Sequence, residues 1–356
     1  MTVLNQSDRA AGPTVASGTG RCASYDWIRV LACVFVCIEH SLSISRLEGM
    51  HPLINLILYY TTESAIPLFF MISGALLLPV TEPAGKFFKK RFLAIGIPFM
   101  AWSILYLCRD ILIYPPYWKI ELVSLPLMPV ANSAFWFLYT IMGLYLVSPV
   151  ISPWLRCCSR RQLRFYLCLW LFTSCYIYIG RFIDGFRFPD MRNPFFYFMG
   201  YIGFYVLGFY IRRFVDVSSR RFICKLSCLI LFGVVLPPVA EQICGLGYIG
   251  EWDLGFPAVC MGLAVYLVVT RLTYQSVSPR WLVCLSSMSF GVYLVNAFVL
   301  SLLDMTGWQY VMGAGEQTFL FSLICILGSY MFIYAVSWLP GAKYIVGAVR
   351  FPHPAP

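Results

Sequence analysis

Apolar runs of membrane-spanning length, separated by short polar segments, make up most of this chain. Because a helix of about 20 apolar residues crosses a bilayer, each run is predicted to be a transmembrane helix. The runs lie at residues 26–46, 53–79, 92–113, 133–153, 162–182, 194–211, 222–241, 254–271, 281–303 and 317–339. The pattern therefore predicts an all-α integral membrane protein, a bundle of about ten transmembrane helices.

The second run, residues 53–79, is longer than one crossing needs and contains residues that interrupt helices. Pro67 lacks a backbone N–H, and Ser73 and Gly74 follow it within two turns. A broken helix at membrane depth is tolerated only where protein or an aqueous cavity covers the freed backbone groups. We therefore expect an interruption in this run.

Lys and Arg residues are distributed unevenly among the polar segments. If the N-terminus is cytoplasmic, six of the 26 fall in outside loops: Arg46, Arg109, Lys119, Arg181, Arg187 and Arg192. Short cytoplasmic loops of membrane proteins carry an excess of positive charge. The distribution predicts an even number of spans with both termini in the cytoplasm.

The composition agrees with a membrane protein and excludes other classes. The chain is 60% hydrophobic and 12% charged, with a mean hydropathy of +0.76, which is too apolar for a soluble domain. Its net charge of +10 follows from the cytoplasmic Lys and Arg residues, so nucleic acid is not an expected partner. We predict a disordered cytoplasmic tail at residues 1–24, a membrane domain at 25–340 and a cytoplasmic C-terminal tail at 341–356.

The sequence contains no motif typical of metal binding or nucleotide binding. Most of the 14 Cys residues lie inside the apolar runs, where Cys behaves as a small hydrophobic residue. The chain has no C-x-x-C pair, no metal-ligand spacing of His and carboxylates, and no phosphate-binding loop. We therefore expect no metal and no bound cofactor.

The first apolar run contains the strongest chemical signal. His40, one of three His residues in the chain, lies eleven residues after Arg29. On a helix this spacing is about 16 Å of rise and about 20° of rotation, so both side chains share a face. Asp26 precedes Arg29 by three residues and can orient it. The run thus presents a cation near one membrane surface and a potential general base deeper in the bilayer.

Each of these residues also has a plain structural interpretation. His40 can be a packed helix residue that bonds to a neighbour, and Arg29 can be a cytoplasmic charge that reaches the membrane surface. Asp26 can simply stabilise the start of a helix. An ionisable residue at this depth is nevertheless a functional candidate by default.

Several motifs together resemble the membrane acyltransferase-3 family. They are Asp26-x-x-Arg29-x₁₀-His40-Ser41, the run from Ile66 to Gly74, Lys89-Lys90-Arg91-Phe92 before Pro98 and Trp102, Trp136 to Tyr139 with Gly143 to Pro149, and Ser289 to Leu294. The resemblance covers roughly residues 24–340 and looks closest to the single-domain branch that acetylates enterobacterial common antigen and similar glycans.

The resemblance implies an O-acyltransferase in the bacterial plasma membrane. It implies acyl-CoA, usually acetyl-CoA, as a cytoplasmic co-substrate, and a hydroxyl of a cell-surface or lipid-linked glycan as acceptor. The Arg and His of its motif map onto Arg29 and His40, which become the catalytic candidates. His40 then acts as general base on the acceptor hydroxyl, or alternatively forms an acyl-histidine.

Further residues are candidates for binding substrate or donor, namely Asp26, Glu63, Lys90, Arg91 and Asn296. Lys90 and Arg91, with Lys86 and Lys89, can hold CoA phosphates, although the charge rule alone explains them. Glu63 lies in the interrupted run and can pair with Arg29 or contact substrate.

The chain departs from the family pattern at three positions. Glu63 stands where an Arg is frequent, and Ala134 and Asn296 stand where His residues are frequent. A rival interpretation is a transporter or flippase of a glycan or small acyl compound, for which an interrupted helix is equally suitable. The Arg29/His40 pair favours the enzyme, because a transporter needs no base beside a donor-binding cation.

Overall fold

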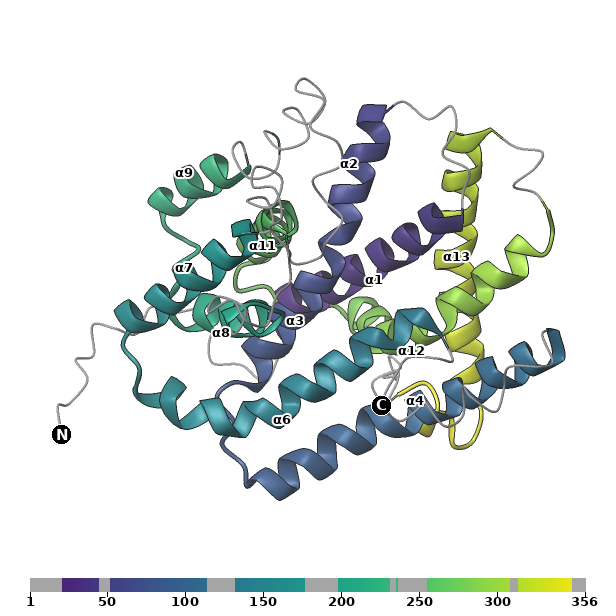
Figure 1. Cartoon of the computed structure of the whole chain (residues 1–356), viewed down its shortest axis with the longest axis horizontal. Coiled ribbons are helices and arrows are strands. Elements are labelled where there is room, and N and C mark those ends of the chain that lie inside the picture. Colours follow the sequence, from purple (N-terminus) through teal and green to yellow (C-terminus); the bar gives the residue numbers. More distant parts are fainter. Residues whose placement is uncertain are drawn as a thin grey trace, which may run out of the picture. The chain divides into compact units, whose positions relative to one another are not determined.

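The computed structural model describes residues 21–44, 52–113, 132–176, 198–230, 235, 255–307 and 313–347. These residues form helices joined by turns and irregular segments, with one isolated antiparallel bridge, between Cys22 and Val277, among them (Figure 1). The predicted all-α class is therefore confirmed for the described part of the chain.

A helix is present at every predicted apolar run. The helices are α1 (Ala23–Ile44), α2 (Pro52–Glu63), α3 (Ala65–Leu77), α4 (Ala84–Ile113), η2 (Ser133–Phe135), α6 (Trp136–Cys157), α7 (Arg160–Tyr176), α8 (Ile202–Phe214), α9 (Arg220–Leu229), α11 (Phe256–Leu272), α12 (Arg280–Asp304), α13 (Ala314–Val336) and η7 (Ala342–Tyr344). This set fits a helical membrane bundle.

Within the described residues, five segments are long and apolar enough to cross a membrane: Ile57–Leu77, Ala84–Ile111, Ser133–Cys157, Arg280–Asp304 and Gly315–Val336. α11 is a shorter apolar helix. The chain is thus a multi-pass membrane protein. The predicted outer loops between residues 114 and 131 and between 183 and 193 lie outside the described residues.

The boundaries of the predicted tails differ from the structure. Ala23 and Ser24 already belong to α1, and the backbone N–H of Ala23 donates to the Ser276 carbonyl over 3.0 Å. At the other end, η7 and the fully buried Val346 are ordered parts of the fold. Residues 1–20 and 348–356 lie outside the described residues.

The second run is interrupted as expected, but at Ser64 and not at Ser73-Gly74. α2 ends at Glu63 and α3 begins at Ala65. Between them the backbone N–H of Ser64 donates to the Thr61 carbonyl over 3.3 Å, which forms a tight turn. Pro67 cannot donate to the carbonyl four residues earlier, which is that of Glu63. The proline therefore interrupts the helix one turn before its own position.

The described helices form two compact units. The first comprises residues up to Phe35, His51–Pro79 and Ser152–Pro279. Its centre is the contact of α3 with α8, where a Cβ on Gly74 would overlap the Tyr205 carbonyl and a Cβ on Gly208 would overlap the Met71 carbonyl. The two glycines therefore let the helix backbones touch, which is common between membrane helices.

The second unit comprises Val36–Met50, Val80–Ile151 and the chain from Arg280 onward. α12 and α13 pack antiparallel, with Gly291 against Ile333 and Asn296 beside Cys325. α4 packs on α12 through the Tyr106 hydroxyl, which donates to the Leu294 carbonyl over 3.1 Å.

Aromatic pairs join α4 to α6 in the second unit. The ring of Phe87 lies 6.0 Å from that of Tyr145, and the ring of Phe99 lies 5.3 Å from that of Tyr139. Because the residue number rises along α4 as it falls along α6, the two helices are antiparallel. Edge-to-face packing of this kind supplements the burial of the rings.

Candidate active site

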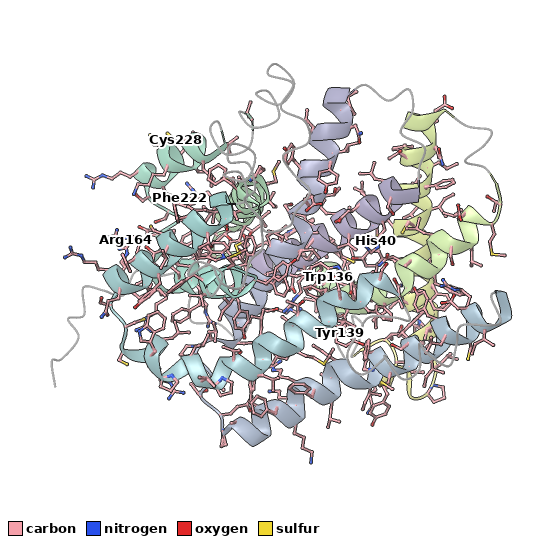
Figure 2. The ribbon with its side chains drawn as sticks, in the orientation of Figure 1. His40, Trp136, Tyr139, Arg164, Phe222 and Cys228 are labelled. Atoms are coloured by element: carbon pink, nitrogen blue, oxygen red, sulfur yellow. The ribbon has the colours of Figure 1, made fainter. Side chains whose placement is uncertain are left out.

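His40 lies in the last turns of α1 (Figure 2). It contacts Asn296 of α12. Its Nδ1 atom is 2.5 Å from Asn296 Oδ1. Asn296 is fully buried, whereas His40 is half-buried. Both residues belong to the second unit, so the structure joins two sequence-predicted site residues that are 256 positions apart.

The hydrogen bonds of Asn296 determine which imidazole nitrogen carries the proton. Its Nδ2 group donates to the carbonyls of Val292 (3.2 Å) and Tyr293 (2.7 Å). Rotating the amide would place an oxygen against two carbonyl oxygens, so Oδ1 must face His40. Oδ1 can only accept, and the neutral imidazole therefore carries its proton on Nδ1. Its Nε2 atom has a lone pair and makes no hydrogen bond to a described residue.

Tyr293 connects the same cluster to the start of α6. Its hydroxyl donates to the Ala134 carbonyl, while its own carbonyl accepts from Asn296. The structure places Ala134 and Asn296, the two positions at which the resemblance led us to expect His, around Tyr293. Sequence reasoning missed this role, although Tyr293 belongs to the late-helix motif that marked the resemblance.

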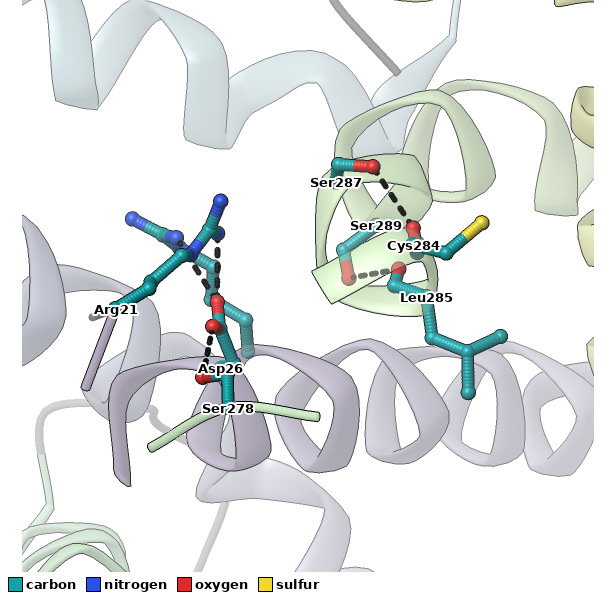
Figure 3. Close-up of polar contacts among 8 residues, drawn as sticks. Arg21, Asp26, Ser278, Cys284, Leu285, Ser287 and Ser289 are labelled. Carbon is teal, nitrogen blue, oxygen red and sulfur yellow. Dashed lines mark hydrogen bonds and ion pairs between the residues drawn. The ribbon is translucent and has the colours of Figure 1, made fainter. Parts of the chain in front are cut away.

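A second polar cluster surrounds Asp26 at the start of α1, in the first unit. The Asp26 carboxylate is fully buried and lies 2.6 Å from the Arg21 guanidinium and 3.7 Å from that of Arg29. Its other oxygen accepts from the Ser278 hydroxyl over 2.5 Å (Figure 3). Asp26 and Arg29 are thus close together as predicted, but Arg21 is the nearer cation.

Arg21 and Ser278 could not be identified from local spacing. The backbone carbonyl of Arg21 accepts from the Ser278 N–H over 2.9 Å, which ties the start of α1 to the segment before α12. This pairing sets two guanidinium groups against one carboxylate, and both are only about 30% exposed. The cluster therefore gathers two guanidinium groups in a sheltered place, and guanidinium groups match the oxygens of anionic ligands.

α1 is unbroken from Ala23 to Ile44, so the helical register of Arg29 and His40 is as predicted. Arg29 contacts Asp26 and His40 contacts Asn296. Eleven residues of helix separate the two side chains by about 16 Å along the axis. The two residues therefore serve separate clusters on one helix.

The remaining candidates occupy different places. Glu63 is the last residue of α2, is 5% exposed, and lies directly at the interruption. Lys90 is exposed on α4, and the half-buried Arg91 lies over the Phe87 ring, 5.7 Å from its centroid. Among described residues, Arg91 Nε has no hydrogen-bond partner. Substrate contacts by these residues stay predictions.

The comparisons with known proteins agree with this arrangement. The model of the acyltransferase-3 family, described as an acyltransferase domain, matches residues 23–338. No curated protein and no solved structure shows significant similarity to the chain. Because the family model covers most of the chain, the protein belongs to the membrane acyltransferase-3 family.

Proposed function

We propose that this membrane acyltransferase is an O-acetyltransferase. It moves an acetyl group from acetyl-CoA on the cytoplasmic side to a hydroxyl of a cell-surface or lipid-linked glycan. The observation that supports this most is the His40–Asn296 hydrogen bond, because it leaves the Nε2 lone pair of His40 available as a base. Membership of the family supports acyl transfer in general.

In the proposed reaction, His40 returns the proton that it takes up, so no external proton is needed. His40 Nε2 takes the proton from the acceptor hydroxyl while the hydroxyl oxygen attacks the thioester carbonyl carbon. The tetrahedral intermediate then expels the CoA thiolate by breaking the C–S bond. The thiolate recovers the proton from His40, which yields free CoA and the acetyl ester. Asn296 Oδ1 accepts the Nδ1–H bond throughout and stabilises the transient imidazolium.

The Asp26 cluster is the proposed donor site. Arg21 and Arg29 lie on the same carboxylate, and a guanidinium has five N–H donors that match phosphate oxygens. Asp26 holds both guanidiniums in place. In this scheme the CoA phosphates bind near the start of α1.

The proposed orientation has both termini in the cytoplasm of a bacterial cell, in the plasma membrane. The distribution of Lys and Arg between alternate loops supports it. Reporter fusions after Arg91 and Arg213 are expected to report cytoplasm, and fusions at Lys119 and Arg187 the outside. A periplasmic signal from the Arg213 fusion contradicts the ten-span orientation.

The interruption at Ser64 favours one rival, a transporter without acyl-transfer chemistry. Interrupted helices expose backbone groups that bind substrates in many transporters, and Glu63 is buried there. The deciding experiment incubates purified protein in nanodiscs with radiolabelled acetyl-CoA and candidate glycans. We expect an alkali-labile labelled ester with the wild type and almost none with His40→Ala. Movement of glycan across proteoliposomes without any ester favours the transporter.

A further inference from the structure

α13 has an unusual distribution of polar residues for a membrane helix. Thr318, Ser322 and Ser329 lie on its buried face, with Cys325 between the last two. Intervals of four, three and four residues keep these side chains on one face. The opposite face is exposed and apolar, with Phe319, Leu323, Leu327 and Met331. We call Thr318, Ser322 and Ser329 the hydroxyl stripe.

The three hydroxyls of the stripe lack the bond that buried hydroxyls in helices usually make. Ser and Thr in helices commonly donate to a carbonyl three or four residues earlier. Ser287 and Ser289 of α12 do so, to the carbonyls of Cys284 and Leu285 (Figure 3). Ser148 and Thr270 do the same over 2.7 Å. The stripe hydroxyls have no hydrogen-bond partner within the described part of the chain.

These hydroxyls are also deeply buried. Thr318 is 4% exposed, Ser322 is 8% exposed and Ser329 is fully buried. A buried polar group without a partner is destabilising, so native proteins rarely keep one without a reason. Three such groups in one row point to a ligand whose polar groups complete their hydrogen bonds.

The stripe passes beside Asn296, whose side chain contacts the proposed base. Cys325 Sγ lies 3.9 Å from the backbone carbonyl of Asn296, whose side chain holds His40. Ser322 and Ser329 are each about one helical turn from Cys325, and the whole stripe spans about 16 Å. All of these residues belong to the second unit. A ligand along the stripe would therefore extend past the His40–Asn296 pair.

We propose that the hydroxyl stripe is the acceptor subsite and binds the hydroxyl groups of a neutral, polyhydroxylated ligand such as a sugar. The inference rests on the proposed acetyl transfer. Ser and Thr hydroxyls both donate and accept, as sugar hydroxyls do. The stripe carries no charge, so it does not suit a phosphate or carboxylate. A row of water molecules is a poorer candidate for the occupant of the stripe. The reaction needs no external proton, and water beside the thioester would hydrolyse the donor.

The test uses two probes of equal chain length, octyl β-glucoside and 1-octanol. Binding of each tritiated probe is measured in nanodiscs, with lipid-only nanodiscs subtracted, for Thr318→Val, Ser322→Ala, Ser329→Ala and the triple variant. We expect each single change to weaken glucoside binding about 2–10-fold, the usual effect of one hydrogen bond, and the triple change to weaken it further. Octanol binding should not change.

A matched control and a stability measurement separate ligand binding from packing. Ser301→Ala removes an α12 hydroxyl that donates to the Phe298 carbonyl over 2.7 Å, and glucoside affinity should stay at the wild-type value. The Tm of the stripe variants should stay the same or rise, because each loses an unsatisfied hydroxyl. A lowered Tm together with weaker binding of both probes would mean that the hydroxyls serve packing, which overturns the proposal.

The results also distinguish failure of the proposed subsite from failure of the proposed acetyl transfer. Unchanged glucoside affinity in the triple variant, or no glucoside binding by the wild type, overturns the subsite. If acetyl transfer to the glucoside proceeds with an unchanged acceptor KM in the triple variant, the transferase stands and the subsite is wrong. If binding depends on the stripe but no ester forms, the subsite stands and the transferase is wrong.

Discussion

Removing His40 and removing its partner Asn296 should reduce acetyl transfer by very different factors. His40→Ala deletes the Nε2 lone pair, and general bases typically contribute about 10²–10⁴-fold to a rate. Asn296→Ala deletes the 2.5 Å hydrogen bond that orients the ring but leaves the base itself. One such neutral bond contributes about 0.5–1.5 kcal/mol, which corresponds to about 2–12-fold in rate.

A third variant separates the loss of the base from the loss of packing. The side-chain N–H group of Asn lies near the position of His Nδ1, so His40→Asn keeps a donor toward Asn296 Oδ1 and removes Nε2. We expect His40→Asn to lower kcat as much as His40→Ala while its Tm stays close to that of the wild type. Acetyl-CoA binding should survive in all three variants, because the donor cluster lies about three helical turns away.

The assay measures kcat and KM for acetyl transfer, with acetyl-CoA affinity measured separately by equilibrium binding in nanodiscs. The order of kcat should be wild type, then Asn296→Ala, then His40→Asn and His40→Ala together. Wild-type kcat in His40→Asn would falsify the assignment of Nε2 as the base. A larger loss in Asn296→Ala than in His40→Ala would show that Asn296, and not the imidazole, carries the chemistry.

The remaining predictions concern the donor cluster, the cytoplasmic charges and the core. Arg29→Ala should raise the KM for acetyl-CoA, and a purely structural Arg29 would lower Tm without changing KM. Joint replacement by Gln of the basic residues at the start of α4, which are Lys86, Lys89, Lys90 and Arg91, should weaken acetyl-CoA binding more at low salt than at high salt, because screening is weaker at low salt. If the variant and the wild type bind acetyl-CoA equally at low salt, these residues serve only to orient the protein in the membrane. Gly208→Ala should lower the stability by about 1–3 kcal/mol because its Cβ overlaps the Met71 carbonyl, whereas the control Gly143→Ala, with open space around it, should not lower the Tm.

Where interactions are local, the sequence was sufficient. Each segment that crosses a bilayer must itself be apolar and about 20 residues long, so the sequence of that segment is enough to predict it. Each predicted run accordingly overlaps a helix in the described residues. The register of Arg29 and His40 also follows from helix geometry alone, because α1 is continuous. Pro67 predicted an interruption in the second run, but only the structure shows that the helix ends at Glu63.

The tertiary structure decided everything that depends on residues distant in the chain. No periodicity relates His40 to Asn296 or Asp26 to Ser278, because these partners meet only when separate helices pack. The bonds from Asn296 to two carbonyls of its own helix, and hence the protonated nitrogen of His40, required the packed geometry. Sequence alone determined which segments form apolar helices and which helix carries His40, since both depend on neighbouring residues. Packing determined which polar groups gain partners and which, such as the hydroxyls of α13, are buried without one.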